Sequence, residues 1–296
     1  MNEMTLPEQL AILFAEECDR GFQNEENQDA VLHIRVSMGD LLIVADGIGG
    51  GEDGAMASRL VVEYFYTHMA ALPHDYPAEK AIRDAAALAN EKLLGVAKAH
   101  GSPKAQMCST LVVVLIQQGR DGISAWTGNI GTSRAYLLRA ERLYRLTTDH
   151  SAAQSMVDRS LVSPEDAQHH PAVAIAIRRL GSQPEVQIDI EQHPLAIGDT
   201  LLLCSYGLWG AVPEKEIEVA AAGEALGAAA HKLLEKALAA DGRDNIAIEM
   251  ARLMVPIPLA APRKVELPRA FKWVVLLFLL AMAGLCVLLF RVLWRH

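Results

Sequence analysis

The sequence predicts an α/β protein in which β-sheets are sandwiched between pairs of helices. Two observations support this class. Strand-like segments occur in clusters, and two long amphipathic helices follow one another between those clusters. Strict βαβ alternation, which builds parallel sheets, is therefore not expected. A length of 296 residues is enough for one large domain, and we predict a single α/β unit over residues 1–253.

The strand predictions depend on short runs of β-branched and apolar residues bounded by turn-forming residues. These runs are 30–36, 41–45, 110–116, 124–127, 134–138, 200–204 and 246–253. The helix predictions depend on apolar residues at helical spacing, with the segment 74–77 separating the two long helices. The predicted helices cover 54–72, 78–99, 151–159, 164–169 and 224–239.

Composition argues against several classes of function. The formal net charge of −9 offers no basic surface of the kind that nucleic-acid binding requires. The four cysteines are scattered and lack C-x-x-C spacing, which argues against both a zinc site and a disulfide framework. Free cysteines are typical of a reducing compartment. We therefore expect no nucleic-acid partner and no structural zinc.

The C-terminal residues predict a membrane anchor. Residues 254–270 contain four prolines and predict a semi-rigid linker. The segment 273–290 has no charged residue and would span about 27 Å as a helix, so we predict a transmembrane helix over 271–294. More Lys and Arg residues precede this segment than follow it. That bias predicts a single-pass tail anchor with the N-terminal domain in the cytoplasm.

The turn after the predicted strand 41–45 is the most informative local feature. Asp46 stands at the end of the strand, and the glycines that follow let the backbone approach a small ligand closely. A carboxylate beside a bare backbone carbonyl suits a hard divalent cation. One alternative is a glycine turn with a purely structural role. Another is a dinucleotide site, since residues 49–54 match G-x-G-x-x-G, although Glu52 and Asp53 would repel a pyrophosphate there.

Several stretches within residues 18–252 resemble, in order, the motifs of the bacterial PPM/PP2C family of metal-dependent Ser/Thr phosphatases. The turn around Asp46 resembles the family's strand-end Asp-Gly motif, and Leu146–Ser151 is similar to its L-T-x-D-H-S motif. The other matching stretches are Asn27–Asp29, Met107–Leu111, Gly131–Tyr136, Arg179–Gly181, Leu202–Leu208 and Gly242–Asn245. The resemblance implies a PP2C-like β-sandwich flanked by helix pairs (αββα), with metal ions at one end.

In that family, Mn²⁺ or Mg²⁺ ions hold the water that attacks the phosphoester, so the resemblance implies no protein nucleophile. Carried over by position, it implies metal binding by four residues. They are Asp46, Gly47 through its carbonyl, Asp244 and Asp29. Asp149 and His150 of the L-T-x-D-H-S motif are expected to fix a loop rather than to transfer protons.

Four positions depart from the family pattern. The family has a metal-binding carboxylate, an acid near a third metal, a glutamate and a phosphate-clamping arginine at these positions. This sequence has Tyr206, Thr132, Gln28 and Asn24, respectively. A phenol with an ordinary pKa near 10 is a poor ligand for Mn²⁺ or Mg²⁺ at neutral pH. We therefore expect one bound ion rather than two, or none.

These departures favour a catalytically impaired, phosphatase-like domain at the membrane. In this hypothesis the domain binds a phosphoprotein or a partner from a kinase pathway without hydrolysing it. The alternative is an active Mn²⁺- or Mg²⁺-dependent Ser/Thr phosphatase with an altered ligand set. A scaffold inside a membrane complex is a third hypothesis.

Overall fold

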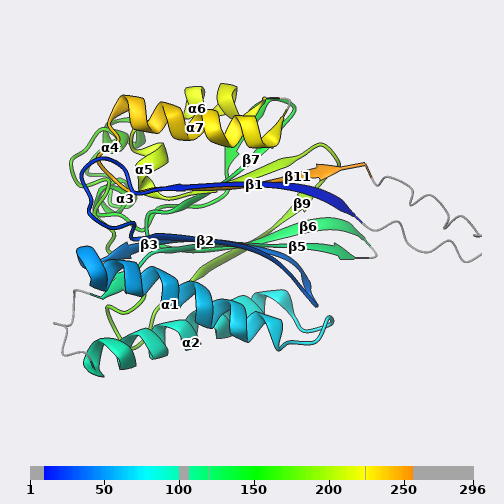
Figure 1. The fold of residues 1–296 in the computed structure, drawn as a ribbon, viewed down its shortest axis with the longest axis horizontal. Helices are drawn as coiled ribbons and strands as arrows, with labels where there is room; N and C mark the ends of the chain where they lie inside the picture. Colours follow the sequence, from blue (N-terminus) through cyan, green and yellow to red (C-terminus); the bar gives the residue numbers. More distant parts are fainter. Residues whose placement is uncertain (1–9, 100–106, 120, 224, 256–296) are drawn as a thin grey trace, which may run out of the picture. The chain divides into compact units, whose positions relative to one another are not determined.

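The computed structural model describes residues 10–99, 107–119, 121–223 and 225–255, and its centre is two β-sheets that face each other (Figure 1). The first sheet has the strand order β1-β11-β10-β7-β8, and the second has the order β2-β3-β5-β6-β9, with β4 paired to β3. Every pair of neighbours is antiparallel. The strands of the first sheet are β1 (Ala11–Asp19), β11 (Ile246–Met254), β10 (Thr200–Cys204), β7 (Arg134–Arg139) and β8 (Arg142–Arg145). Those of the second are β2 (Asp29–Val36), β3 (Gly39–Ile48), β5 (Leu111–Gly119), β6 (Gly122–Ile130) and β9 (Asp189–Leu195), with β4 (Cys108–Ser109).

Alternating side chains on the central strands build three apolar layers. In β3, Leu42 and Val44 face the other sheet, whereas Leu41 and Ile43 face the helices on the outer side. All four are fully buried. Strands that are buried on both faces read as nearly continuous apolar runs, which is why the sequence predicted them correctly.

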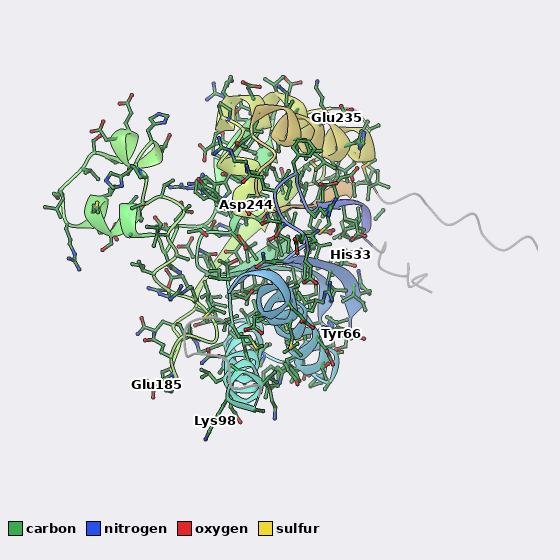
Figure 2. All side chains as sticks on the ribbon, turned by 60° about the vertical axis from the view of Figure 1, so that its left-hand side comes forward. His33, Tyr66, Lys98, Glu185, Glu235 and Asp244 are labelled. Atoms are coloured by element: carbon green, nitrogen blue, oxygen red, sulfur yellow. The ribbon has the colours of Figure 1, made fainter. Side chains whose placement is uncertain are left out.

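Helix pairs cover the outer faces of both sheets (Figure 1). Helices α1 (Gly51–Ala70) and α2 (Ala78–Ala99) pack on the second sheet, and α6 (Glu214–Ala221) and α7 (Leu226–Ala240) pack on the first. The short helix α5 (Tyr206–Trp209) follows β10. Helices α3 (Ala152–Asp158) and α4 (Pro164–Gln168) belong to residues 151–180, which we call the flap. In Figure 2 the helices of the flap protrude to one side of the sandwich.

The predicted α/β sandwich with flanking helix pairs is confirmed, and each predicted strand and helix is present. The bounds of α2 and β10 are as predicted, and those of the other predicted elements are shifted. Six elements were not predicted from the sequence: β1, β4, β8, β9, α5 and α6. Strand β1 lies at a sheet edge and is half solvated, so acidic residues and the exposed Leu13 interrupt its pattern. Strand β9 is also an edge strand and contains Pro194, which normally argues against a strand assignment.

The predicted membrane anchor falls outside the described residues. The structure describes the chain only to residue 255, so most of the predicted linker and all of segment 271–294 lie beyond it. Within the described ranges, no helix is both long enough and apolar enough to cross a membrane. The domain boundary at residue 253 and the anchor therefore stay predictions.

Candidate metal centre

Two carboxylates face each other where the inter-sheet space opens at one end of the sandwich. Asp29 at the start of β2 pairs directly with Asp46 in the register of β3. Asp46 shares its face of β3 with Leu42 and Val44, which point between the sheets. Directly opposed residues in an antiparallel pair have Cβ atoms about 5 Å apart, and like charges there destabilise the sheet. This pair therefore requires protons or a cation.

Hydrogen bonds to the start of β5 fix the backbone of Asp46. The Asp46 N–H donates to the Thr110 hydroxyl at 3.1 Å, and the Thr110 N–H donates to the Asp46 carbonyl at 2.8 Å. The Thr110 hydroxyl in turn lies 2.7 Å from that of Ser133, and both residues are buried. The position of the Asp46 carboxylate is thus set by a rigid strand rather than by a loop.

The glycines after Asp46 allow a close backbone approach. The Gly47 N–H donates to the Gln28 carbonyl at 2.9 Å, and a Cβ on Gly47 would lie 2.0 Å from the Gly54 carbonyl oxygen. Gly50 and Gly51 have φ values of 78° and 53°, the left-handed region that glycine adopts at little cost. These residues turn the chain from β3 directly into α1.

Asn245 connects the turn that carries Asp244 to the loop before β2. Its side-chain amide donates to the Arg20 carbonyl at 2.7 Å, and its Oδ1 accepts from the Gln28 N–H at 2.9 Å. The Asn245 N–H also donates to the Asp244 carboxylate at 2.9 Å. One buried amide therefore links the segment of Asp244 to the segment of Asp29.

Ser205 reaches Asp29 from the opposite sheet. Its hydroxyl donates to Asp29 Oδ2 at 2.6 Å and accepts from the Ala247 N–H at 2.9 Å. Asp29 is 6% exposed, and its Oδ1 is buried without a partner among the described atoms. That oxygen is available to a cation. Ser205 was not predicted to be a site residue, although it stands just before the altered position 206.

The electrostatics of the three carboxylates also indicate a cation. Burial, and then the charge of Asp244, raises the pKa of Asp46 to about 7. Burial, and then the charge of Asp46, raises the pKa of Asp29 above its ordinary value, although the Ser205 hydrogen bond opposes this. Burial also raises the pKa of Asp244. A divalent cation would reverse these shifts by favouring the charged carboxylates.

The donor set fits Mn²⁺ or Mg²⁺ with much of its water retained. Among the described residues, no three or more His, Cys, Asp or Glu side chains converge closely enough to hold a single ion. Mg²⁺ typically keeps several waters and binds through one or two carboxylates, so a closed cage is not required. Asp29, Asp46, Asp244 and the Gly47 carbonyl supply only oxygen, which suits these hard cations. Their role as ligands stays a prediction.

Tyr206, at the position where a carboxylate was expected, is turned toward its own helix. Its ring packs edge-on against Trp209, with ring centroids 4.8 Å apart. A Cβ on Gly210 would lie 2.6 Å from Tyr206 Cζ, so the ring covers that glycine. Burial and the nearby charge of Asp244 raise the pKa of the phenol, which keeps it neutral.

The other three altered positions make mainly structural contacts. The Thr132 carbonyl accepts from the Trp209 indole N–H at 2.9 Å. The Gln28 side chain lies against Gly54, where a Cβ would approach its Oε1 to 2.0 Å. Asn24 donates to the Arg243 carbonyl at 3.3 Å. None of the three side chains bears a charge.

Asp149 and His150 fix the base of the flap, as expected. Asp149 accepts two hydrogen bonds from the Arg134 guanidinium, at 2.9 and 2.6 Å, and both residues are buried. His150 Nδ1 accepts from the Gly131 N–H at 3.0 Å, and its Nε2 lies 2.9 Å from an Asp189 oxygen. This geometry holds the flap beside the sandwich.

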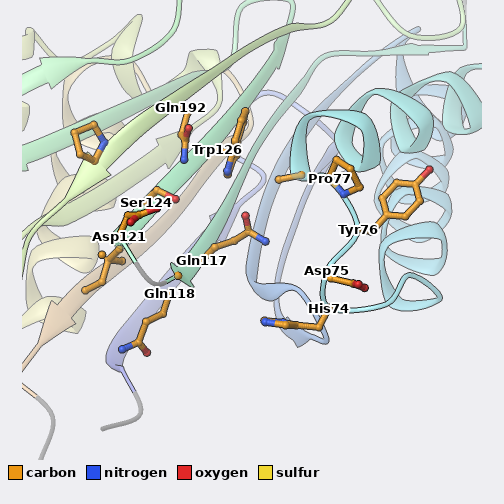
Figure 3. Close-up of a pocket in the computed structure, with 15 residues that line it drawn as sticks. His74, Asp75, Tyr76, Pro77, Gln117, Gln118, Asp121, Ser124, Trp126 and Gln192 are labelled. Atoms are coloured by element: carbon orange, nitrogen blue, oxygen red, sulfur yellow. The ribbon is translucent and has the colours of Figure 1, made fainter. Parts of the chain in front are cut away.

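A cavity of about 570 Å³ lies at the far end of β5 (Figure 3). It is bordered by Tyr76, Gln117 and Trp126, among others, and includes none of the three carboxylates of the metal centre. Thr110 contacts Asp46 just before β5 begins, and Gln117 lies seven residues further along, roughly 24 Å away. Cavity size therefore does not identify the metal centre; the carboxylates do.

The comparisons identify the class to which this fold and site belong. Residues 22–239 match the model of the family Protein phosphatase 2C. The chain is 33% identical over 245 residues to the serine/threonine protein phosphatase PstP of Mycobacterium tuberculosis, covering 82% of this chain and 45% of that protein. It is 33% identical over 231 residues to the serine/threonine phosphatase stp of Listeria monocytogenes, covering 77% of this chain and 85% of that protein.

Solved structures agree with this class. The crystal structure of M. tuberculosis PstP/Ppp has a TM-score of 0.75 and 29% identity, covering 83% of this chain and 100% of that one. The catalytic domain of PstP in complex with two manganese ions has a TM-score of 0.72 and covers the same shares. The chain belongs to the protein phosphatase 2C family.

Proposed function

We propose that this protein is a Mn²⁺- or Mg²⁺-dependent serine/threonine phosphatase that acts on phosphoproteins in kinase signalling. The observation that carries the proposal is the opposed pair Asp29 and Asp46, with Asp244 close enough to raise the pKa of both. Membership of the protein phosphatase 2C family supports it. The manganese ions in the related PstP structure support the choice of metal.

The residues of the chain divide into those that hold a cation and those that position them. Asp29, Asp46, Asp244 and the Gly47 carbonyl would hold it. When bound, a divalent cation activates water and neutralises charge on the phosphoryl group. Ser205 orients the Asp29 carboxylate by a hydrogen bond of 2.6 Å. Because these supports come from both sheets, the site depends on the stacking of the sandwich.

A second candidate is binding of a phosphoprotein without hydrolysis. It is favoured by Tyr206 and Asn24, which are neutral where the family pattern has a carboxylate and a phosphate-clamping arginine. Loss of a cation would weaken the electrostatic grip on a dianionic phosphate. We prefer the enzyme because three carboxylates of the site remain and because its relatives carry the name of phosphatases.

Turnover of a phosphoserine peptide with and without Mn²⁺ tests the proposal. We expect Mn²⁺-dependent phosphate release, and a loss of more than about 100-fold in Asp46→Asn, because the cation loses one of its few ligands. Asp75→Asn is the matched control, since Asp75 is exposed on the α1–α2 turn and should leave the rate unchanged. Mn²⁺-independent release, or equal rates in Asp46→Asn and the control, would contradict the enzyme. Peptide binding without release would favour the second candidate.

We also propose that segment 271–294 anchors the domain to a membrane with the catalytic domain on the cytoplasmic side. The support is the uncharged run 273–290 and the excess of basic residues before it. Protease treatment of closed vesicles made from inverted and from right-side-out membranes tests the orientation. We expect the domain to be digested only in inverted vesicles. Recovery of the full chain in the soluble fraction would contradict the anchor.

A further inference from the structure

A pocket of about 320 Å³ lies between the flap and the segment that follows β10. Tyr206, Trp209 and Val212 line one side, and His169 and Val173 of the flap line the other. Its volume is near the lower limit for ligand sites and suits one or two amino-acid side chains. The pocket is therefore a candidate for the recognition of a short piece of chain.

The charged groups at the pocket already have partners. Arg134 is 4% exposed, donates twice to Asp149 and lies 3.2 Å from Glu214. The ring of Trp209 covers Arg134, with the guanidinium carbon 3.3 Å from the ring centroid. The positive charge is thus neutralised and shielded. What remains for a ligand is an aromatic and aliphatic surface from Tyr206, Trp209 and Val173, with polar groups of similar extent beside it.

Tyr206 lines the pocket and also lies near the metal centre. The preceding residue, Ser205, donates to Asp29, and the charge of Asp244 acts on the Tyr206 phenol. A single residue therefore borders both places. A peptide whose phosphate lies at the carboxylates would bring a neighbouring side chain to the pocket, since an extended chain advances about 3.3 Å per residue.

We propose that this pocket is a subsite for an uncharged, apolar side chain within about three residues of the phosphorylated serine or threonine. The subsite rests on the proposed function. It also gives Tyr206 a role, because residue 206 then forms a wall of the peptide site in place of a metal ligand. Leucine and phenylalanine suit its aromatic and aliphatic lining, whereas a glutamate would meet the positive charge of Arg134 only where Asp149 and Glu214 already neutralise it.

The test uses phosphoserine peptides that differ only at one of the three positions on either side of the phosphoserine. Alanine, leucine, phenylalanine, glutamate and lysine are compared by fluorescence anisotropy in Mn²⁺, and turnover is measured in parallel. We expect leucine or phenylalanine at one position to bind about tenfold or more tightly than alanine, as burial of such a side chain implies. Glutamate at that position should bind no better than alanine, and lysine, which the half-exposed Glu214 can attract, should bind less tightly than leucine.

Val173→Asp places a charge in the flap wall and should reduce the apolar preference to within about twofold. Val219→Asp is the matched control, because Val219 is 62% exposed on α6 and lies outside the pocket. Thermal unfolding shows whether Val173→Asp folds. If it does not, Val173→Ala replaces it and should lower the apolar preference in part. No preference in the unaltered protein, or a preference equal in Val173→Asp and Val219→Asp, would overturn the subsite. The preference without turnover would contradict the proposed activity and still support the subsite.

Discussion

Glu249 is a buried carboxyl group that the proposed chemistry does not use, and we predict that its ionisation destabilises the protein. It lies on β11 and is fully buried, and both of its oxygens lack a partner among the described atoms. Ala247 and Ala251, two positions to either side, belong to the apolar layer between the sheets. Burial, and then the charge of its cross-strand neighbour Glu16, raises the pKa of Glu249 to about 8.

The magnitude follows from proton linkage. The unfolded chain has the ordinary value of 4.5, so the folded state binds the proton more tightly. Stability is therefore complete below about pH 4.5 and falls as the pH rises toward the folded pKa. For these two pKa values, the free energy of unfolding falls by about 3 to 4 kcal/mol between about pH 5 and about pH 8.

Urea unfolding of Glu249→Gln and of the unaltered protein at each pH tests this prediction, with a chelator in both samples. Glutamine has the shape of the neutral acid but no proton to lose. We expect the variant to gain about 3 to 4 kcal/mol relative to the unaltered protein between about pH 5 and about pH 8. The other carboxylates titrate in both proteins and cancel. Glu63→Gln, at an exposed position on α1, is the control and should show no gain. Parallel pH profiles for Glu249→Gln and the unaltered protein would refute the reasoning.

Three further predictions concern the site and its supports. Protons compete with Mn²⁺ for Asp46, whose pKa is about 7. Below pH 7, the Mn²⁺ affinity measured by calorimetry should therefore rise by up to about tenfold for each unit of increasing pH. An affinity that does not change with pH would contradict this prediction. Tyr206→Asp should strengthen Mn²⁺ binding by about tenfold or more, because it adds a negative charge near the carboxylates, whereas Tyr206→Phe should leave the affinity unchanged. Equal Mn²⁺ affinities in the two variants would contradict this prediction. Arg134→Leu should cost about 3 kcal/mol in urea unfolding, because the buried Asp149 loses two hydrogen bonds and keeps only Arg145, 3.9 Å away, as a countercharge. Arg83→Leu, in an exposed pair, should cost less than about 1 kcal/mol.

The sequence predicted the elements that are buried on both faces and missed those that are half solvated. Residues 41–45 of β3 and 201–204 of β10 are apolar without interruption because a sheet or helix covers each face. Strand β1 is only partly buried on both faces, and the exposed Leu13 and Glu16 break the period of two. Helix α6 is a short, acidic segment that becomes helical by packing with α7 against the first sheet.

The same distinction applies to the site. Asp46 could be found locally, because a carboxylate followed by glycines is visible in a short window. The pairing of Asp29 with Asp46 depends on strand register, and the contact from Ser205 depends on how the two sheets stack. Neither is encoded in local spacing. The direction of the Tyr206 ring was likewise not predictable, since it follows from contact with Trp209 and Gly210.

Strand β11 contributes to the inter-sheet face both at the metal centre and inside the sandwich. Asn245, just before β11, joins the segments of Asp29 and Asp244, and Glu249 follows four residues later, roughly 14 Å along the strand. With a pKa of about 8, Glu249 is mostly neutral at pH 7, so it adds little to the negative charge at the mouth of the sandwich. The attraction for a cation therefore comes from the carboxylates at that mouth, and Glu249→Gln should alter stability without altering Mn²⁺ affinity near neutral pH.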